Sequence, residues 1–122
     1  MPSSPARPGF ARRLPSGRVP RAAIRKYVRK IVECFKPQRV ILFGSHAYGT
    51  PHADSEVDLL IVMPCRSMID MAVRIRLAFG SPFFMDLLVY TPEYLQKRLD
   101  LGDWFVREVL DKGLVLYDAT HP

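Results

Sequence analysis

The segment VILFGSHAYGTPHADSEVDLLIV, from Val40 to Val62, decides the fold. Its two short apolar runs, 40–43 and 59–62, flank a loop of small, polar and turn-forming residues, a pattern that predicts two buried strands. Glu56 and Asp58 open the second run, and alternation along a strand puts both acids on one face. Paired carboxylates beside a core strand are costly without a positive partner, so they predict a divalent metal with oxygen ligands.

Gly44 and Ser45 end the first of these runs. A glycine at the end of a strand allows the backbone to approach a ligand closely. If Ser45 begins a helical turn, the free N–H groups at its start form an anion site suited to phosphate. A phosphate site beside paired acids predicts a metal–nucleotide site.

The order of these residues resembles a known signature. Gly44-Ser45, ten intervening residues and then acid-x-acid is similar to the motif of DNA-polymerase-beta-type nucleotidyltransferases. Further positions resemble the subgroup called minimal nucleotidyltransferases (MNT): Ala47, Gly49, Ser55, Asp58 and Leu59. The resemblance covers residues 21–117. One position departs from it, since Glu56 stands where the family usually has Asp, and Mg²⁺ requires tight octahedral geometry.

Asp86 is the exception in FFMDLLVY, residues 83–90, which is otherwise an apolar strand pattern. A buried aspartate needs a partner. An ion pair with Arg74 or Arg76 is one interpretation. Because two acids already mark a site, we favour a third carboxylate on an adjacent strand. The resemblance implies the same, since the family's third acid lies on a following strand and three acids can bridge two Mg²⁺ ions.

The remaining pattern alternates helices and strands. Apolar periodicity, capping residues and breakers predict helices at 21–36, 68–79, 92–99 and 103–112, and a last edge strand at 114–117. The predicted class is therefore α/β, with a small mixed β-sheet of three to four strands and flanking helices. The resemblance implies the polymerase-beta-type nucleotidyltransferase fold.

Two of these helices have predicted buried faces. The apolar side of 68–79 is assigned to Ile69, Ala72, Val73, Ile75 and Leu77. The core side of 103–112 is assigned to Trp104, Phe105, Val109 and Leu110, with contact between Trp104 and a partner as an alternative.

The histidines and cysteines carry weaker signals. His46 and His52 fit no zinc spacing and are predicted to be exposed loop residues, with contact to phosphate or base as the alternative. Cys34 and Cys65 have no CxxC spacing and are expected to be buried free thiols rather than a disulfide.

Charge is distributed unevenly along the 122 residues. Residues 1–30 contain nine Lys or Arg and no acid, whereas the rest contains nine Lys or Arg and all twelve acids. Five prolines lie within residues 1–20, which we expect to be a disordered basic tail ahead of one domain at 21–122. This asymmetry argues against a nucleic-acid groove that extends across the fold. Binding of nucleic acid by a basic N-terminal arm remains an alternative.

The sequence also bears on location. No apolar run approaches the roughly 18 residues that span a bilayer, and the N-terminus has no apolar segment of the secretory type. We therefore expect no membrane association and a cytoplasmic location.

The resemblance implies a Mg²⁺-dependent nucleotidyltransferase that moves a nucleoside monophosphate, AMP from ATP, to a hydroxyl acceptor. Glu56, Asp58 and Asp86 would be the catalytic and metal-binding acids, and Gly44 and Ser45 would hold the β- and γ-phosphates. Small MNT proteins resemble the antitoxin half of MNT/HEPN toxin–antitoxin pairs, in which a tyrosine of the HEPN ribonuclease is adenylylated. Two alternatives remain: a catalytically silent module that occludes a partner protein, and a transferase on RNA ends that uses the basic tail.

Overall fold

A computed structural model of the chain describes residues 19–51 and 55–121. Its sheet has the order β3-β2-β1-β4, and the strands are β1 (Arg39–Phe43), β2 (Val57–Val62), β3 (Met85–Tyr90) and β4 (Leu114–Asp118). β1 is antiparallel to β2 and β4, whereas β2 and β3 are parallel. The mixed sheet of an α/β fold is therefore confirmed, and β4 lies at an edge as predicted.

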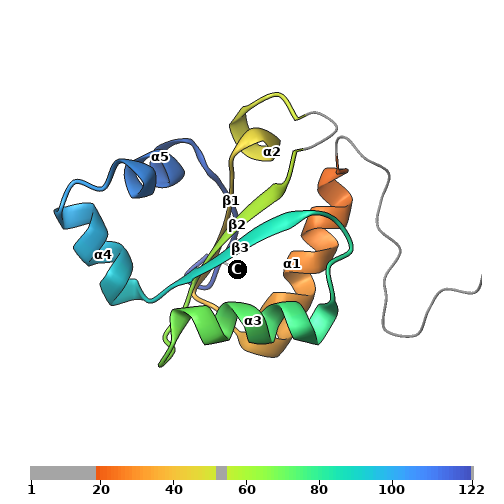
Figure 1. Cartoon of the computed structure of the whole chain (residues 1–122), viewed down its shortest axis with the longest axis horizontal. Coiled ribbons are helices and arrows are strands. Elements are labelled where there is room, and N and C mark those ends of the chain that lie inside the picture. Colours follow the sequence, from red (N-terminus) through yellow and green to blue (C-terminus); the bar gives the residue numbers. More distant parts are fainter. Residues whose placement is uncertain (1–18, 52–54, 122) are drawn as a thin grey trace, which may run out of the picture.

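Helices cover both faces of this sheet (Figure 1). They are α1 (Arg21–Phe35), α2 (Ser45–Tyr48), α3 (Met68–Phe79), α4 (Pro92–Asp100) and α5 (Trp104–Lys112). Side chains of Ser67, Thr91 and Asp103 cap α3, α4 and α5 by accepting a backbone N–H, which explains why these helices begin within a residue of their predicted starts.

Alternation along the strands divides the core into two layers. On one side, Leu59 and Ile61 of β2 pack with α1 and with Ile75 of α3. On the other side, Leu60 and Val62 of the same strand pack with α4 and α5. Residues of β2 with even numbers therefore face the layer of α4 and α5, and Asp58 shares their side of the strand.

The predicted buried face of α3 is largely wrong. Ile75 is buried and Ala72 is half-buried, but Ile69, Val73 and Leu77 are exposed. This helix is apolar around much of its circumference, so periodicity did not reveal which side meets the sheet. Trp104 is also exposed, because it is the first residue of α5 and lies outside the layer formed by Phe105 and Val109.

The start of the chain and the cysteines also differ from expectation. The predicted tail lies outside the described residues except for Val19 and Pro20, and Val19 is buried against the domain. Both thiols are free, as predicted, but Cys34 is exposed and Cys65 only half-buried. Cys34 lies in the last turn of α1 beside residues that face solvent, so its position follows from the helix rather than from its own hydrophobicity. No helix in the described ranges is both long and apolar enough to cross a membrane.

Candidate active site

Two carboxylates meet where β2 and β3 begin. Asp58 and Asp86 are direct partners in the parallel register of these strands. Residues with even numbers on β3, such as Leu88, pack with the α4 and α5 layer, so both acids lie on that face of the sheet. The structure thus brings Asp86 beside Asp58, as the sequence pattern predicted.

The alternative ion pair of Asp86 with an arginine is not formed. Among residues 19–51 and 55–121, the ion pairs are Arg98–Asp103 and Lys112–Glu108. The guanidinium of Arg76 instead donates to the carbonyl oxygen of Met85 at 3.3 Å.

Glu56 completes the acidic group from the segment just before β2, where its side chain is exposed. Asp58 is half-buried, and burial raises the pKa of its carboxyl to about 6, with smaller contributions from the negative charges of Asp86 and Glu56. Burial and the two neighbouring negative charges therefore destabilise the ionised form of Asp58. This is the electrostatic situation that a bound cation relieves.

The loop that begins at Gly44, directly after β1, lies against this acidic group, and we call it the motif loop. The backbone of Gly44 has φ 76° and ψ −157°, a conformation that is essentially restricted to glycine. A Cβ at this position would overlap the carboxylate of Asp58. The predicted helical turn follows as α2, and the N–H groups of Ser45 and His46 at its start have no acceptor within the helix.

His46 is buried, so its prediction as an exposed loop residue is wrong. Its Nε2 accepts a hydrogen bond from the Val19 N–H at 3.2 Å, and its Nδ1 lies 3.0 Å from the carbonyl oxygen of Glu56. Both bonds form only in the neutral tautomer that carries its proton on Nδ1. His46 therefore ties the start of the domain to the backbone of an acidic residue. His52 lies outside the described residues.

Sequence reasoning missed this role because neither partner of the imidazole is a side chain. Hydrogen bonds to backbone groups 27 and 10 residues away leave no spacing pattern. Arg21 strengthens the same junction, since its guanidinium donates to the carbonyl oxygen of His46 at 3.0 Å.

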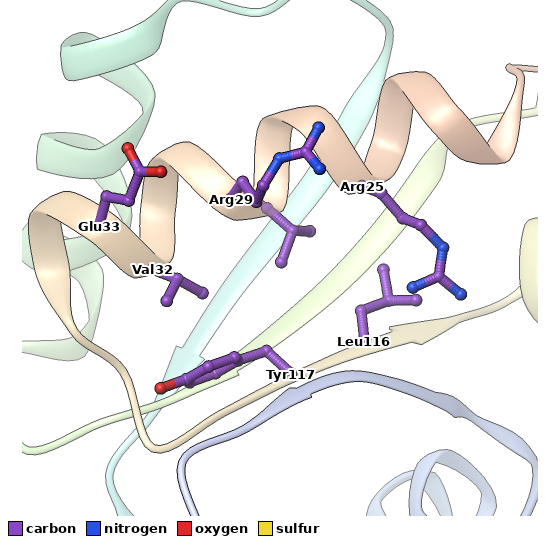
Figure 2. A pocket seen from close by; sticks show the side chains of 7 residues that line it. Arg25, Arg29, Val32, Glu33, Leu116 and Tyr117 are labelled. Carbon is purple, nitrogen blue, oxygen red and sulfur yellow. The ribbon is translucent and has the colours of Figure 1, made fainter. Parts of the chain in front are cut away.

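The domain has one hollow beside α2 and another between α1 and β4. The first, of about 390 Å³, adjoins the motif loop and is lined by Val19, Arg21, Ser45, His46, Ala47, Gly49 and Pro51. The second, of about 310 Å³, is a groove between α1 and β4. In this groove Arg25 reaches toward Leu116, and Glu33 lies toward one end (Figure 2). The predicted site residues do not line the second groove, so it is separate from the acidic group.

The acidic residues suit a hard divalent cation. Their donor atoms are carboxylate oxygens, which Mg²⁺ prefers, and they carry charge that no neighbouring Lys or Arg among the described residues neutralises by an ion pair. No three His, Cys, Asp or Glu side chains in the described parts of the chain converge into a closed metal cluster. An open group of carboxylates of this kind suits Mg²⁺, which proteins usually bind through one or two carboxylates while phosphates and water supply its other ligands.

Comparisons with known proteins agree with this arrangement. The model of the nucleotidyltransferase domain family matches residues 22–81. The chain is 30% identical over 99 residues to "Putative protein adenylyltransferase MJ0604" of Methanocaldococcus jannaschii, covering 78% of this chain and 95% of that protein.

A solved structure shares the fold. A "putative nucleotidyltransferase" from Sulfolobus solfataricus superposes with a TM-score of 0.53 at 16% identity, covering 81% of this chain and 80% of that one. A chain of the toxin–antitoxin pair MntA–HpeT aligns less well, with a TM-score of 0.49 and 21% identity over 84% of this chain and 77% of that one. On the strength of the sequence relationships, this chain belongs to the nucleotidyltransferase family and is a nucleotidyltransferase enzyme.

Proposed function

We propose that this enzyme transfers AMP from ATP to a hydroxyl group of a partner protein. The observation that carries the proposal is the pairing of Asp58 with Asp86 in register, beside a glycine whose backbone adjoins Asp58. This arrangement places carboxylates and free backbone N–H groups within one small region. Such a combination suits the transfer of a phosphate-bearing group.

Each residue has a proposed role. Glu56 and Asp58 would hold the Mg²⁺ that accompanies the triphosphate, and Asp86 would join them in holding a second ion. Gly44 and Ser45 bind the β- and γ-phosphates through backbone N–H groups and the serine hydroxyl. Bound Mg²⁺ would lower the pKa of the acceptor hydroxyl and neutralise charge on the phosphates.

The reaction is a substitution at the α-phosphorus of ATP. The acceptor oxygen forms a bond to this phosphorus while the bond to pyrophosphate breaks. The hydroxyl proton passes to Asp86, which acts as general base. Pyrophosphate leaves with the electron pair of the broken bond, and its negative charge lies toward the N–H groups of Ser45 and His46.

The choice of a protein acceptor is supported by the relative in Methanocaldococcus, whose name describes a protein adenylyltransferase and nearly all of which this chain covers. The motif resemblance narrows the proposal to a tyrosine of a HEPN-type toxin, with this chain as the antitoxin. ATP is the proposed nucleotide because the name of this relative describes transfer of an adenylyl group.

The test is incubation of the full chain with α-labelled ATP, Mg²⁺ and the protein encoded beside its gene. We expect label on that protein, with none when Asp58→Asn replaces the wild type. Label that persists with a folded Asp58→Asn variant would refute the assignment of the site. A tight complex without label would instead favour the silent, occluding module, and label on added RNA would favour transfer to RNA ends.

A further inference from the structure

Three large aliphatic side chains of α3 face solvent in a single row. Ile69, Val73 and Leu77 are 78%, 48% and 79% exposed. Residues four positions apart advance by about 40° around a helix, so the three lie within an arc of about 80°. Ile75 packs in the core from nearly the opposite side of α3, so the row faces away from the core. We call these three residues the α3 stripe.

Apolar surface continues beside the stripe. A hollow of about 400 Å³ lies between α3 and β3, and Ile69 and Val73 form part of its wall together with Leu87 and Val89. The wall is mainly apolar, and its one charged residue among those described is Arg76. β3 is the outermost strand on this side of the sheet. A contiguous apolar surface of this kind on a small soluble domain marks a contact surface.

Two opposite charges accompany the stripe on the side away from the hollow. Asp70 and Arg74 are exposed, and neither forms an ion pair within residues 19–51 and 55–121. Relative to Val73 at the centre of the stripe, they lie about 60° and 100° around the helix in the same direction. The acid precedes the centre and the base follows it.

We propose that the α3 stripe binds the α3 stripe of a second copy of this chain, with the two helices antiparallel and a two-fold axis beside Val73. In that arrangement Val73 meets its own counterpart, and Ile69 of one copy meets Leu77 of the other. Asp70 of each copy comes beside Arg74 of its partner, because a two-fold axis keeps residues on the same side of the paired helices. The surface is thus complementary to itself in both shape and charge, as a two-fold interface requires.

This self-complementarity decides in favour of a second copy over a different protein. An unrelated partner would need an apolar row, but would not require an acid before the centre and a base after it on the same side of the row. The interface is also independent of the proposed function. Asp58 and Asp86 share the sheet face covered by α4 and α5, so pairing through α3 leaves both acids accessible.

The first test is sedimentation equilibrium of the full chain over a range of micromolar concentrations. We expect a monomer–dimer equilibrium that Val73→Asp weakens at least about tenfold, since it places two carboxylates at the two-fold axis. Leu101→Asp is the matched control, because Leu101 is 66% exposed at the end of α4, and we expect it to leave the equilibrium unchanged.

The second test is a charge exchange. Asp70→Arg and Arg74→Asp should each weaken the dimer several-fold, and the combined variant should restore it, because the exchanged charges attract again across the interface. Circular dichroism verifies that each variant is folded. A monomer at every concentration, a dimer indifferent to Val73→Asp, or a combined variant no better than the single ones would overturn the proposal. Loss of binding to a different protein in Val73→Asp, with no self-association of the wild type, would also overturn it.

Discussion

The carboxylate of Asp58 occupies the space where a side chain on Gly44 would begin. Because a Cβ there would overlap this carboxylate, the glycine is required both by its backbone conformation and by its neighbour. The end of β1 and the start of β2 are thus joined at the acidic group itself.

Gly44→Ala should therefore destabilise the protein and impair transfer. The backbone conformation costs about 1–3 kcal/mol for a residue with a side chain, and displacement of Asp58 adds to that loss. We expect the free energy of unfolding, measured with urea, to fall by about 3 kcal/mol. Under conditions where the variant is folded, AMP transfer should fall at least about tenfold, because Asp58 has moved.

Gly102→Ala is the matched control for Gly44→Ala. Gly102 also has a positive φ, 77°, but a Cβ at this position meets no atom within 4 Å. We expect a loss of about 1 kcal/mol in stability and unchanged transfer. Equal effects of the two substitutions on transfer would show that the contact with Asp58 is unimportant.

The pKa of Asp58 predicts how the stability of the metal-free protein depends on pH. Its folded-state pKa, about 6, is higher than the ordinary aspartate value of 3.8, so the folded state holds this proton more tightly than the unfolded state. The resulting stabilisation is complete below about pH 4 and is lost as pH rises through about 6. Because Asp58 is only half-buried, solvent screening reduces the expected loss to about 1 kcal/mol.

This pH dependence is measured as the difference between the wild type and Asp58→Asn in urea denaturation with a chelator present. Asn cannot titrate, so the variant should be the more stable protein at pH 7 and should lack this part of the pH dependence. Addition of Mg²⁺ should stabilise the wild type more than the variant at pH 7. Parallel pH curves for the two proteins would contradict the assigned pKa.

The sequence was most informative where local chemistry determines structure. Turn residues and caps located the strands and helices, and the isolated Asp86 in an apolar strand revealed its proximity to Asp58. It was least informative where a choice depends on tertiary packing. The exposure of the row on α3 and the burial of His46 both depend on contacts between segments far apart in the sequence. No local periodicity of the sequence reveals such contacts.

Substitutions of Glu56 show whether a glutamate can bind the metal at a position where the family usually has aspartate. Glu56→Gln removes the charge while keeping the length, so we expect Mg²⁺ affinity and transfer to fall at least about tenfold. Glu56→Asp keeps the charge and should retain most of the transfer. Calorimetric titration with Mg²⁺ and the rate of AMP transfer measure the two effects. If Gln matches the wild type in both, Glu56 does not hold the metal.

Two substitutions of His46 each remove one of its two hydrogen bonds and keep the other. In His46→Asn, the side-chain N–H₂ takes the place of Nδ1 and can still donate to the carbonyl oxygen of Glu56, while the Val19 N–H loses its acceptor. In His46→Gln, the side-chain oxygen takes the place of Nε2 and can still accept from Val19, while the Glu56 carbonyl loses its donor. Each variant loses one buried hydrogen bond of the side chain at position 46, so its free energy of unfolding should fall by about 1–2 kcal/mol.

Transfer should distinguish these variants even though their stabilities are similar. Only Gln releases the backbone of Glu56, so we expect it to lower Mg²⁺ affinity and kcat, whereas Asn should remain close to the wild type in both. The comparison is made at a temperature where urea denaturation shows both variants to be fully folded. Equal losses of transfer would mean that His46 serves stability alone. A larger loss in Asn would mean that the anchored Val19 segment, rather than the position of Glu56, controls the site.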